Sequence, residues 1–315
     1  MKLVSIPANP VPEGAVTGML KTSDGASIRF ARWEPPQGRK GTVCLFPGRS
    51  EFIEKYFEVV QDARQRGFGV AMIDWRGQGL SQRRLSDPRK GHVEDFAEFD
   101  RDLDVFMKEV VLPDCAPPHF ALAHSMGGAI LLRSAYQGRR WFDRMVLSAP
   151  MLGLAGAAGS RATRATTKFM RMFGFGSSYV PGGSATAVGT RPFAGNVLTS
   201  DPVRYGRTVA ILNEEPNLGL GSPTFAWLDE AFKVMTDFLD HAYTARIHQP
   251  ILAVCAGQDE VVSTPTTAIV MGRLRAGSHL VIPGARHEIM MEQDRYREQF
   301  WAAFDAFVPG SPLFR

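Results

Sequence analysis

Apolar and polar positions change their spacing repeatedly along the first half of this chain. Short apolar runs, each typical of a buried strand, occur at 42–46, 69–73, 119–124 and 144–148. Between them, apolar residues recur every three or four positions at 51–66 and 92–111, which predicts amphipathic helices. Strands that alternate with helices in this way predict the α/β class, with a mainly parallel sheet flanked by helices.

The pattern extends to both ends of the chain. Residues 19–33 predict a hairpin, because two strand-like runs flank the turn residues Thr22-Ser23-Asp24-Gly25. After a gap, alternation resumes with strands at 250–255 and 279–283 and with helices at 265–274 and 288–307.

The stretch between these two alternating parts has a different composition. It is rich in Gly, Ala, Thr and Arg and contains no clear buried strand. We therefore expect a core formed by residues 1–150 and 246–315, with a helical cap inserted at 151–245. Ligands bind beyond the carboxyl ends of the strands in such sheets, so the cap is expected to cover that end.

Ser125 follows the strand at 119–124 directly, and a helix-forming run begins immediately after it. A serine on a sharp strand-to-helix turn is a nucleophile elbow, which exposes its hydroxyl to a base and to substrate. The small residues Ala123, Gly127 and Gly128 suit the crowded backbone of such a turn. A packed turn without chemistry is the alternative, so the interpretation depends on a base and an acid elsewhere.

A serine hydroxyl needs a base, and the base needs an acid that orients it. His287 follows the predicted strand 279–283, and Asp259 follows the strand 250–255, so both reach the edge where Ser125 lies. We expect these three residues to be catalytic. Glu260 is a rival acid and His279 a rival base, but His279 lies within a strand. His124 is too close in sequence to turn back on Ser125.

Acyl transfer also needs donors for the oxyanion. The amide of Met126 lies at the start of the helix after Ser125, and the amide of Arg49 lies in the loop after the strand 42–46. Gly48 permits close approach of that loop. We expect Met126 and Arg49 to form the oxyanion hole, with a plain turn as the alternative for Arg49.

Five segments together resemble the alpha/beta-hydrolase family, in its monoacylglycerol lipase and lysophospholipase branch, which is grouped with serine aminopeptidase-like hydrolases. They are Phe46-Pro47-Gly48-Arg49, Asp74-Trp75-Arg76-Gly77-Gln78-Gly79-Leu80-Ser81, His124-Ser125-Met126-Gly127-Gly128, Gly257-Gln258-Asp259 and Ala285-Arg286-His287-Glu288. The order Ser, Asp, His along the chain is the one this fold uses. The family usually has His at Pro47 and Gly at Ala123, although neither change removes a backbone donor. The resemblance implies that Asp74 and Arg76 brace the sheet rather than contact substrate.

The composition limits which partners and cofactors can be expected. The net charge of +4 is mild and no basic block or nucleic-acid motif accompanies it, so we expect no nucleic-acid partner. The three cysteines are too widely spaced for a disulfide framework or a zinc site, and no metal or cofactor is expected. Because the first residues resemble neither a signal peptide nor a membrane span, we expect a cytoplasmic protein, with peripheral contact to a membrane as the alternative.

The cap is where specificity is expected. Residues 160–173 predict a helix with Arg161, Arg164, Lys168 and Arg171 on one face and Phe169, Met172 and Phe173 largely away from it. We expect its apolar side to pack on the cap core, with contact to an anionic membrane as the alternative. Four further apolar residues either line an acyl pocket or form cap core: Phe175, Trp227, Met235 and Phe238.

These residues predict a serine hydrolase that cleaves a carboxylic ester through an acyl-enzyme. A small-molecule or lipid ester, such as a lysophospholipid or monoacylglycerol, is the expected substrate. Three alternatives remain: an aminopeptidase that holds an ammonium group through Glu214 or Glu215, an acyltransferase, and a non-catalytic ligand-binding protein.

Overall fold

Residues 2–35 and 40–308 are described by a computed structural model, and within them eight strands form one sheet in the order β1-β2-β4-β3-β5-β6-β7-β8. The strands are β1 (Val16–Lys21), β2 (Ser27–Trp33), β3 (Thr42–Phe46), β4 (Gly69–Ile73), β5 (His119–His124), β6 (Arg144–Ser148), β7 (Ile251–Ala256) and β8 (Gly277–Ile282). Pairing is antiparallel from β1 to β4 and parallel from β4 through β8. The predicted α/β class with a mainly parallel sheet is thus confirmed.

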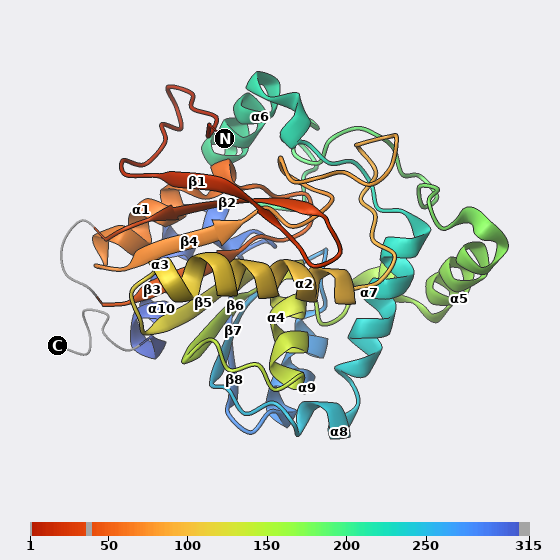
Figure 1. Ribbon diagram of the computed structural model, residues 1–315. Coiled ribbons are helices and arrows are strands. Elements are labelled where there is room, and N and C mark those ends of the chain that lie inside the picture. The colour runs from red at the N-terminus through yellow and green to blue at the C-terminus, as the bar shows by residue number, and fades with distance from the viewer. Residues whose placement is uncertain (1, 36–39, 309–315) are drawn as a thin grey trace.

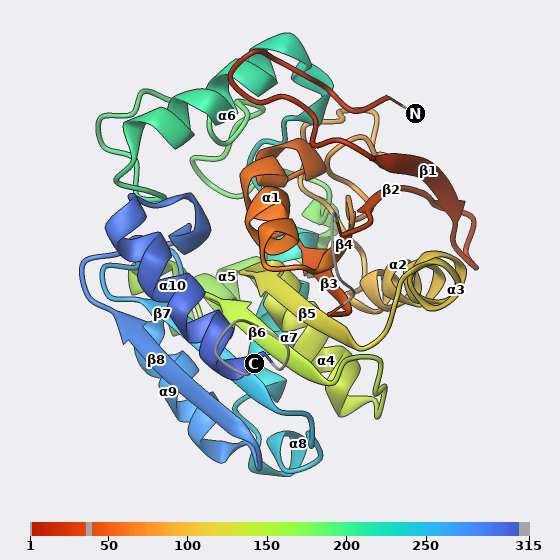
Figure 2. The same cartoon turned by 90° about the vertical axis from the view of Figure 1, so that its left-hand side faces the viewer.

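Helices cover both faces of this sheet. Figures 1 and 2 show α1 (Phe57–Gln65) and α10 (Asp294–Phe307) on one face, and α2 (Ala97–Phe106), α4 (Met126–Tyr136) and α9 (Thr264–Arg273) on the other. Shorter helical pieces are η1 (Ile53–Tyr56), η2 (Met107–Val111), α3 (Leu112–Asp114) and η6 (Ile289–Met291). Two helices begin later than their periodicity predicts. α2 begins at Ala97, after Asp95 accepts a hydrogen bond from the Ala97 amide, and α10 begins at Asp294.

The hydrophobic core surrounds the strands that lead into the candidate site. Every residue of β3, β4 and β7 is buried. Phe46 at the end of β3 contacts the rings of Trp75, Phe106 and Phe142, with ring centroids 5.7 to 6.0 Å apart. Aromatic packing of this kind fixes strand ends, so the loops that follow β3 and β5 leave a rigid edge.

The segment between β6 and β7 is mostly helix and turn. It contains η3 (Gly156–Gly159), α5 (Arg161–Met170), η4 (Arg171–Phe175), α6 (Pro202–Glu214), η5 (Pro216–Leu218), α7 (Phe225–Asp237) and α8 (His241–Thr244). Figure 1 shows α7 beyond the strand ends and α5 outside it, farthest from the sheet. The helical character predicted for this segment agrees with these elements, whereas its role as a separate cap with the bounds 151–245 stays a prediction.

Among the described residues, none of the helices combines the length and the apolar character that crossing a bilayer requires.

Candidate active site

Ser125 joins β5 to α4 in a backbone conformation that non-glycine residues rarely adopt, with φ 48° and ψ −113°. The two glycines after it are needed for close packing. A Cβ on Gly127 would lie 2.5 Å from the carbonyl oxygen of Phe46, and one on Gly128 would lie 2.8 Å from Pro150 Cβ. The local sequence therefore folds into a sharp turn because only small residues fit there, and the turn holds the hydroxyl at the strand end.

The structure brings the three predicted catalytic residues into one hydrogen-bonded chain. Ser125 Oγ lies 3.1 Å from His287 Nε2, and His287 Nδ1 lies 2.9 Å from Asp259 Oδ2. The other Asp259 oxygen accepts the amides of Val261 and Val262, both at 2.9 Å. Burial raises the pKa of Asp259, but His287 and these amides outweigh it and hold the pKa below its usual value. An ionised Asp259 fixes the proton on Nδ1, which leaves Nε2 free to accept the serine proton.

The rival residues lie elsewhere. Glu260 and His279 are both exposed, and neither has a contact with Ser125 in the described part of the chain. His124 is buried and points away from the serine: its Nδ1 lies 2.9 Å from Glu51 and its Nε2 lies 3.2 Å from the His287 carbonyl oxygen. Ala123 is fully buried within β5, so its methyl group is accommodated.

Two backbone amides remain free beside the serine. Those of Gly48 and Ser50 already donate to side-chain oxygens. Among the described residues, no acceptor is found for the amides of Arg49 and Met126. A Cβ on Gly48 would lie 3.1 Å from Ser125 Cβ, so this loop lies against the nucleophile. Both predicted donors therefore stand next to the hydroxyl, and their role as an oxyanion hole stays a prediction.

Glu51 is a site residue that the sequence analysis missed. Its carboxylate accepts hydrogen bonds from the Gly48 amide, the Tyr56 hydroxyl, the Lys55 ammonium and the His124 ring. Lys55 in turn lies 2.6 Å from Glu288, the residue after His287. Burial raises the pKa of Glu51, but the charges of His124 and Lys55 bring it well below its usual value. The buried carboxylate of Glu51 thus connects three segments: the loop after β3, the turn at Ser125 and the loop of His287.

The only sequence signal of this network is the pair Glu51 and Lys55, four positions apart, which is the spacing of a common surface ion pair. Nothing in the pattern of the chain marks it as buried.

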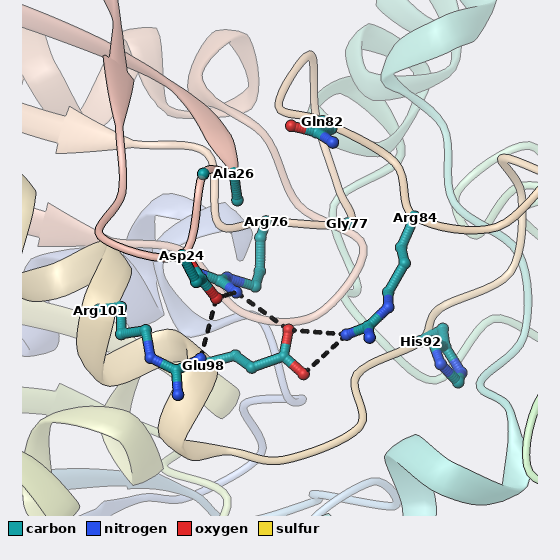
Figure 3. A pocket seen from close by; sticks show the side chains of 10 residues that line it. Asp24, Ala26, Arg76, Gly77, Gln82, Arg84, His92, Glu98 and Arg101 are labelled. Atoms are coloured by element: carbon teal, nitrogen blue, oxygen red, sulfur yellow. Dashed lines mark hydrogen bonds and ion pairs between the residues drawn. The ribbon is translucent and has the colours of Figure 1, made fainter.

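In the loop from Asp74 to Ser81 the two charged residues hold the sheet, whereas Gln78 donates to the carbonyl oxygens of Gly48 and Glu51 beside the nucleophile. Asp74 and Arg29 form a fully buried ion pair at 2.6 Å. Arg76 pairs with three carboxylates: Asp24, Glu98 and Asp102. Figure 3 shows Arg76, Asp24 and Glu98 beside a cavity, with Arg84 on the far side of Glu98. The volume of this cavity is about 380 Å³. Burial outweighs Arg76 and raises the pKa of Asp102 to about 6. The contacts agree with the bracing role that the family resemblance implies.

The prediction for the helix at 160–173 was right in its amphipathic pattern and wrong in its orientation. The large apolar side chains of α5 and η4 are exposed: Phe169 by 54%, Met172 by 72%, Phe173 by 59% and Phe175 by 49%. Arg171 binds Asp229 and Glu230 of α7, and Arg164 donates to Thr236. Because α7 offers acidic and polar partners, two arginines of the basic face turn inward and the apolar face is left outside.

The apolar residues of α7 belong to the core. Trp227, Met235 and Phe238 are at most 6% exposed and pack in the main hydrophobic cluster. Phe175 is separate from them, at the surface.

A second cavity, of about 450 Å³, lies near the loops of the site. It is lined in part by Arg49, Arg191, Leu198 and Tyr205. The Leu198 carbonyl accepts the amide of Glu288 at 2.8 Å, which places this wall against the loop of His287.

Comparisons with known proteins agree with this arrangement. A family model described as serine aminopeptidase, S33, matches residues 37–294. The lysophospholipase L2 of Escherichia coli K12 is 32% identical over 286 residues, covering 87% of this chain and 82% of that protein. The probable lysophospholipase L2 of Haemophilus influenzae is 27% identical and covers 87% and 86%.

Solved structures show the same fold. A soluble variant of monoglyceride lipase from Saccharomyces cerevisiae, in complex with a substrate analog, has a TM-score of 0.71 at 19% identity, covering 93% of this chain and 96% of that one. A monoacylglycerol lipase from Paleococcus ferrophilus has a TM-score of 0.69 at 21% identity, covering 90% and 99%. The alpha/beta-hydrolase resemblance inferred from the sequence is confirmed.

Proposed function

Since this chain belongs to the serine aminopeptidase S33 family, we propose that it is a serine hydrolase whose catalytic residues are Ser125, His287 and Asp259. The observation that carries the proposal is the continuous chain from Ser125 Oγ through the imidazole of His287 to Asp259, with contacts of 3.1 and 2.9 Å.

The reaction follows from that geometry. Ser125 Oγ attacks the ester carbonyl while His287 Nε2 takes its proton, and Asp259 stabilises the resulting imidazolium. The amides of Arg49 and Met126 donate to the oxyanion, aided by the N-terminus of α4. His287 then protonates the leaving alcohol, and a water attacks the acyl-enzyme through the same base. Both proposed donors are backbone amides next to fixed strand and helix ends, which favours little reorganisation during the reaction.

The proposed substrate is a lysophospholipid, or the related monoacylglycerol. The names of the relatives with the greatest coverage support lysophospholipids, and those of the structural neighbours support monoacylglycerols.

An aminopeptidase reading is less well supported. It requires a carboxylate beside the site to bind the substrate ammonium group. Glu214 is exposed at the end of α6, and Glu215 accepts the Asn217 amide there. The larger cavity beside the His287 loop is lined by Arg49 and Arg191 and by no acidic residue. The smaller one adjoining it contains Glu51 and Glu288, and both of these carboxylates already bind Lys55.

We also propose that α5 and η4 touch a membrane surface. Four large apolar side chains are exposed together in these two elements, and exposed Arg161 and Lys168 lie on the same helix. Apolar residues flanked by cations suit an interface of anionic lipids. The cytoplasmic location expected from the sequence stays a prediction.

Purified protein and its Ser125→Ala variant test the catalytic proposal. We expect a fluorophosphonate probe to label the parent protein and not the variant, and hydrolysis of a p-nitrophenyl ester, a lysophospholipid and a monoacylglycerol to fall by about a thousandfold or more in the variant. Ser278→Ala, an exposed serine on β8, is the matched control. Full activity in Ser125→Ala would overturn the proposal, and faster turnover of aminoacyl amides than of esters would favour the peptidase.

A further inference from the structure

The guanidinium of Arg49 has an environment that suits an anionic ligand. Its Nη1 donates to the Gly221 carbonyl at 2.9 Å, and the group lies 5.6 Å from the centre of the Trp227 ring. In the described part of the chain no carboxylate pairs with it. Burial alone lowers the pKa of Arg49 to about 10. A half-buried arginine without a counter-ion is costly, because its charge has lost part of its hydration and gained no opposite charge.

The cavity in front of this guanidinium is positive. Arg191 contributes a second cation at its exposed rim, and no acidic side chain lines it. Glu51 and Glu288 line a smaller adjoining cavity that shares Arg49, but both bind Lys55, and Glu51 also binds the His124 ring. Two arginines facing a space without acids form a site for a phosphate, because a guanidinium presents several donors to phosphate oxygens.

The same segment places this cation next to the reacting atoms. Gly48 contacts Ser125, and Arg49 follows it directly, so the amide of Arg49 faces the nucleophile while its side chain extends into the cavity. In a lysophospholipid, the phosphate is separated from the scissile ester by only the glycerol unit. We therefore expect an ester held at Ser125 to place its phosphate in the cavity that Arg49 lines.

We propose that Arg49, with Arg191 at the rim, binds the headgroup phosphate of a lysophospholipid and so makes the enzyme prefer lysophospholipids to monoacylglycerols. This rests on the proposed ester hydrolase at Ser125 and specifies its substrate class. A monoacylglycerol has no group to replace the water around Arg49, whereas a phosphate gives that cation its missing partner. Discrimination of this kind is strong, because the analogue leaves a polar group of the site unpaired.

The test compares lysophosphatidylglycerol with the monoacylglycerol of the same acyl chain, both dispersed in neutral detergent. In Arg49→Met we expect kcat/KM for the lysophospholipid to fall by about tenfold to a hundredfold. The loss for the monoacylglycerol should be much smaller, so that the ratio of the two kcat/KM values falls by about tenfold or more. For the lysophospholipid, the kcat/KM of Arg49→Lys should lie between those of the parent protein and Arg49→Met, because a lysine keeps the charge without the planar donors. Arg140→Met, an exposed arginine, is the matched control.

Equal losses for the two substrates, or no loss for either, would overturn the phosphate site. Should Arg49→Met fail to fold, Arg191→Met at the exposed rim replaces it, with a smaller loss confined to the lysophospholipid. Inhibition of p-nitrophenyl ester hydrolysis by inorganic phosphate, without any preference for the lysophospholipid, would assign the site to free phosphate and also overturn the proposal. If the proposed hydrolase activity itself is wrong, the result differs: the parent protein would show neither labelling by the fluorophosphonate probe nor turnover of any ester.

Discussion

The carboxylate of Glu51 does more at the site than its place in the sequence suggests. It holds the loop that presents the Arg49 amide, through Gly48, and it holds His124, the residue before the nucleophile. Through Lys55 it also reaches Glu288, the residue after His287. Removing its charge should therefore disturb three parts of the site together.

We expect Glu51→Gln to lower kcat by about tenfold or more with a much smaller change in KM, because the oxyanion loop loses its anchor while the substrate cavity is unchanged. Steady-state kinetics on a p-nitrophenyl ester and the rate of fluorophosphonate labelling measure this. Glu109→Gln on the exposed side of η2 is the control.

A Glu51→Gln variant that melts at a lower temperature yet keeps the kcat of the parent would show that Glu51 acts on stability alone.

At the scale of single residues, the sequence predicted that Ser125, Asp259 and His287 come together, but it gave no indication of Glu51 beside them. Ser125, Asp259 and His287 each follow a strand that is recognisable from its apolar run, so their meeting could be predicted from the order of the elements. Glu51 is distinguished from a surface carboxylate by its burial, and the role proposed for the Arg49 side chain depends on its lack of a carboxylate partner. Neither property has a local pattern, because each depends on segments that are remote in the sequence.

Among the elements, α5 shows how a correct period can accompany a wrong orientation. Its heptad-like spacing fixes which residues share a face, but the choice of buried face depends on the neighbour. Asp229 and Glu230 lie about sixty positions away, on α7, and they draw Arg171 inward. No feature of residues 160–173 alone reveals those two carboxylates.

The exposed face of α5 and η4 leads to a prediction for lipid binding. The double variant Phe169→Ser and Phe173→Ser should weaken partitioning onto vesicles of phosphatidylglycerol and phosphatidylcholine by about tenfold or more, because two phenyl rings no longer leave water. Co-sedimentation with the vesicles measures the bound fraction. Turnover of a short, water-soluble ester should be unaffected.

The matched control is Leu112→Ser, which is 50% exposed on α3 at a distance in the sequence from the proposed surface. Equal loss of vesicle binding in the control and in the double variant would contradict the proposed contact.

Across the whole molecule, Glu58 on α1 connects the core to the segment between β6 and β7. Its carboxylate binds Arg204 and Arg207 of α6 and also Arg297 of α10. Burial raises the pKa of Glu58, but these three guanidinium groups outweigh it and lower the pKa from 4.5 to about 2. A carboxylate whose pKa falls on folding stabilises the fold at every pH above its unfolded value.

We therefore expect Glu58→Gln to reduce the free energy of unfolding by about 2 kcal/mol near neutral pH. The difference should shrink as the pH falls from about 4.5 toward 2, because protonation then removes the same charge from the parent protein. Urea unfolding of both proteins at about pH 6.5 and at about pH 3.5 measures it.

For comparison, Glu298→Gln changes an exposed carboxylate on α10 and should have little effect at either pH. A penalty for Glu58→Gln that does not vary with pH would mean that the ion pairs contribute nothing to stability.

The arrangement of the whole sheet was predictable in part. Alternating strands and helices predict parallel pairing, but the order β2-β4-β3-β5 has no signal in the spacing of apolar residues. That order places the loop after β3 beside the elbow after β5, so that Gly48 lies against Ser125.

The backbone of Ser125 has a consequence for heat resistance. The backbone of Ser125 is held at φ 48°, which a residue with a side chain rarely adopts. The rest of the fold must therefore supply the free energy that keeps it there. A glycine in that position would relieve the strain, and the resulting protein, although inert, should melt at a higher temperature than the parent. Chemical reactivity and thermal endurance therefore compete at this one residue.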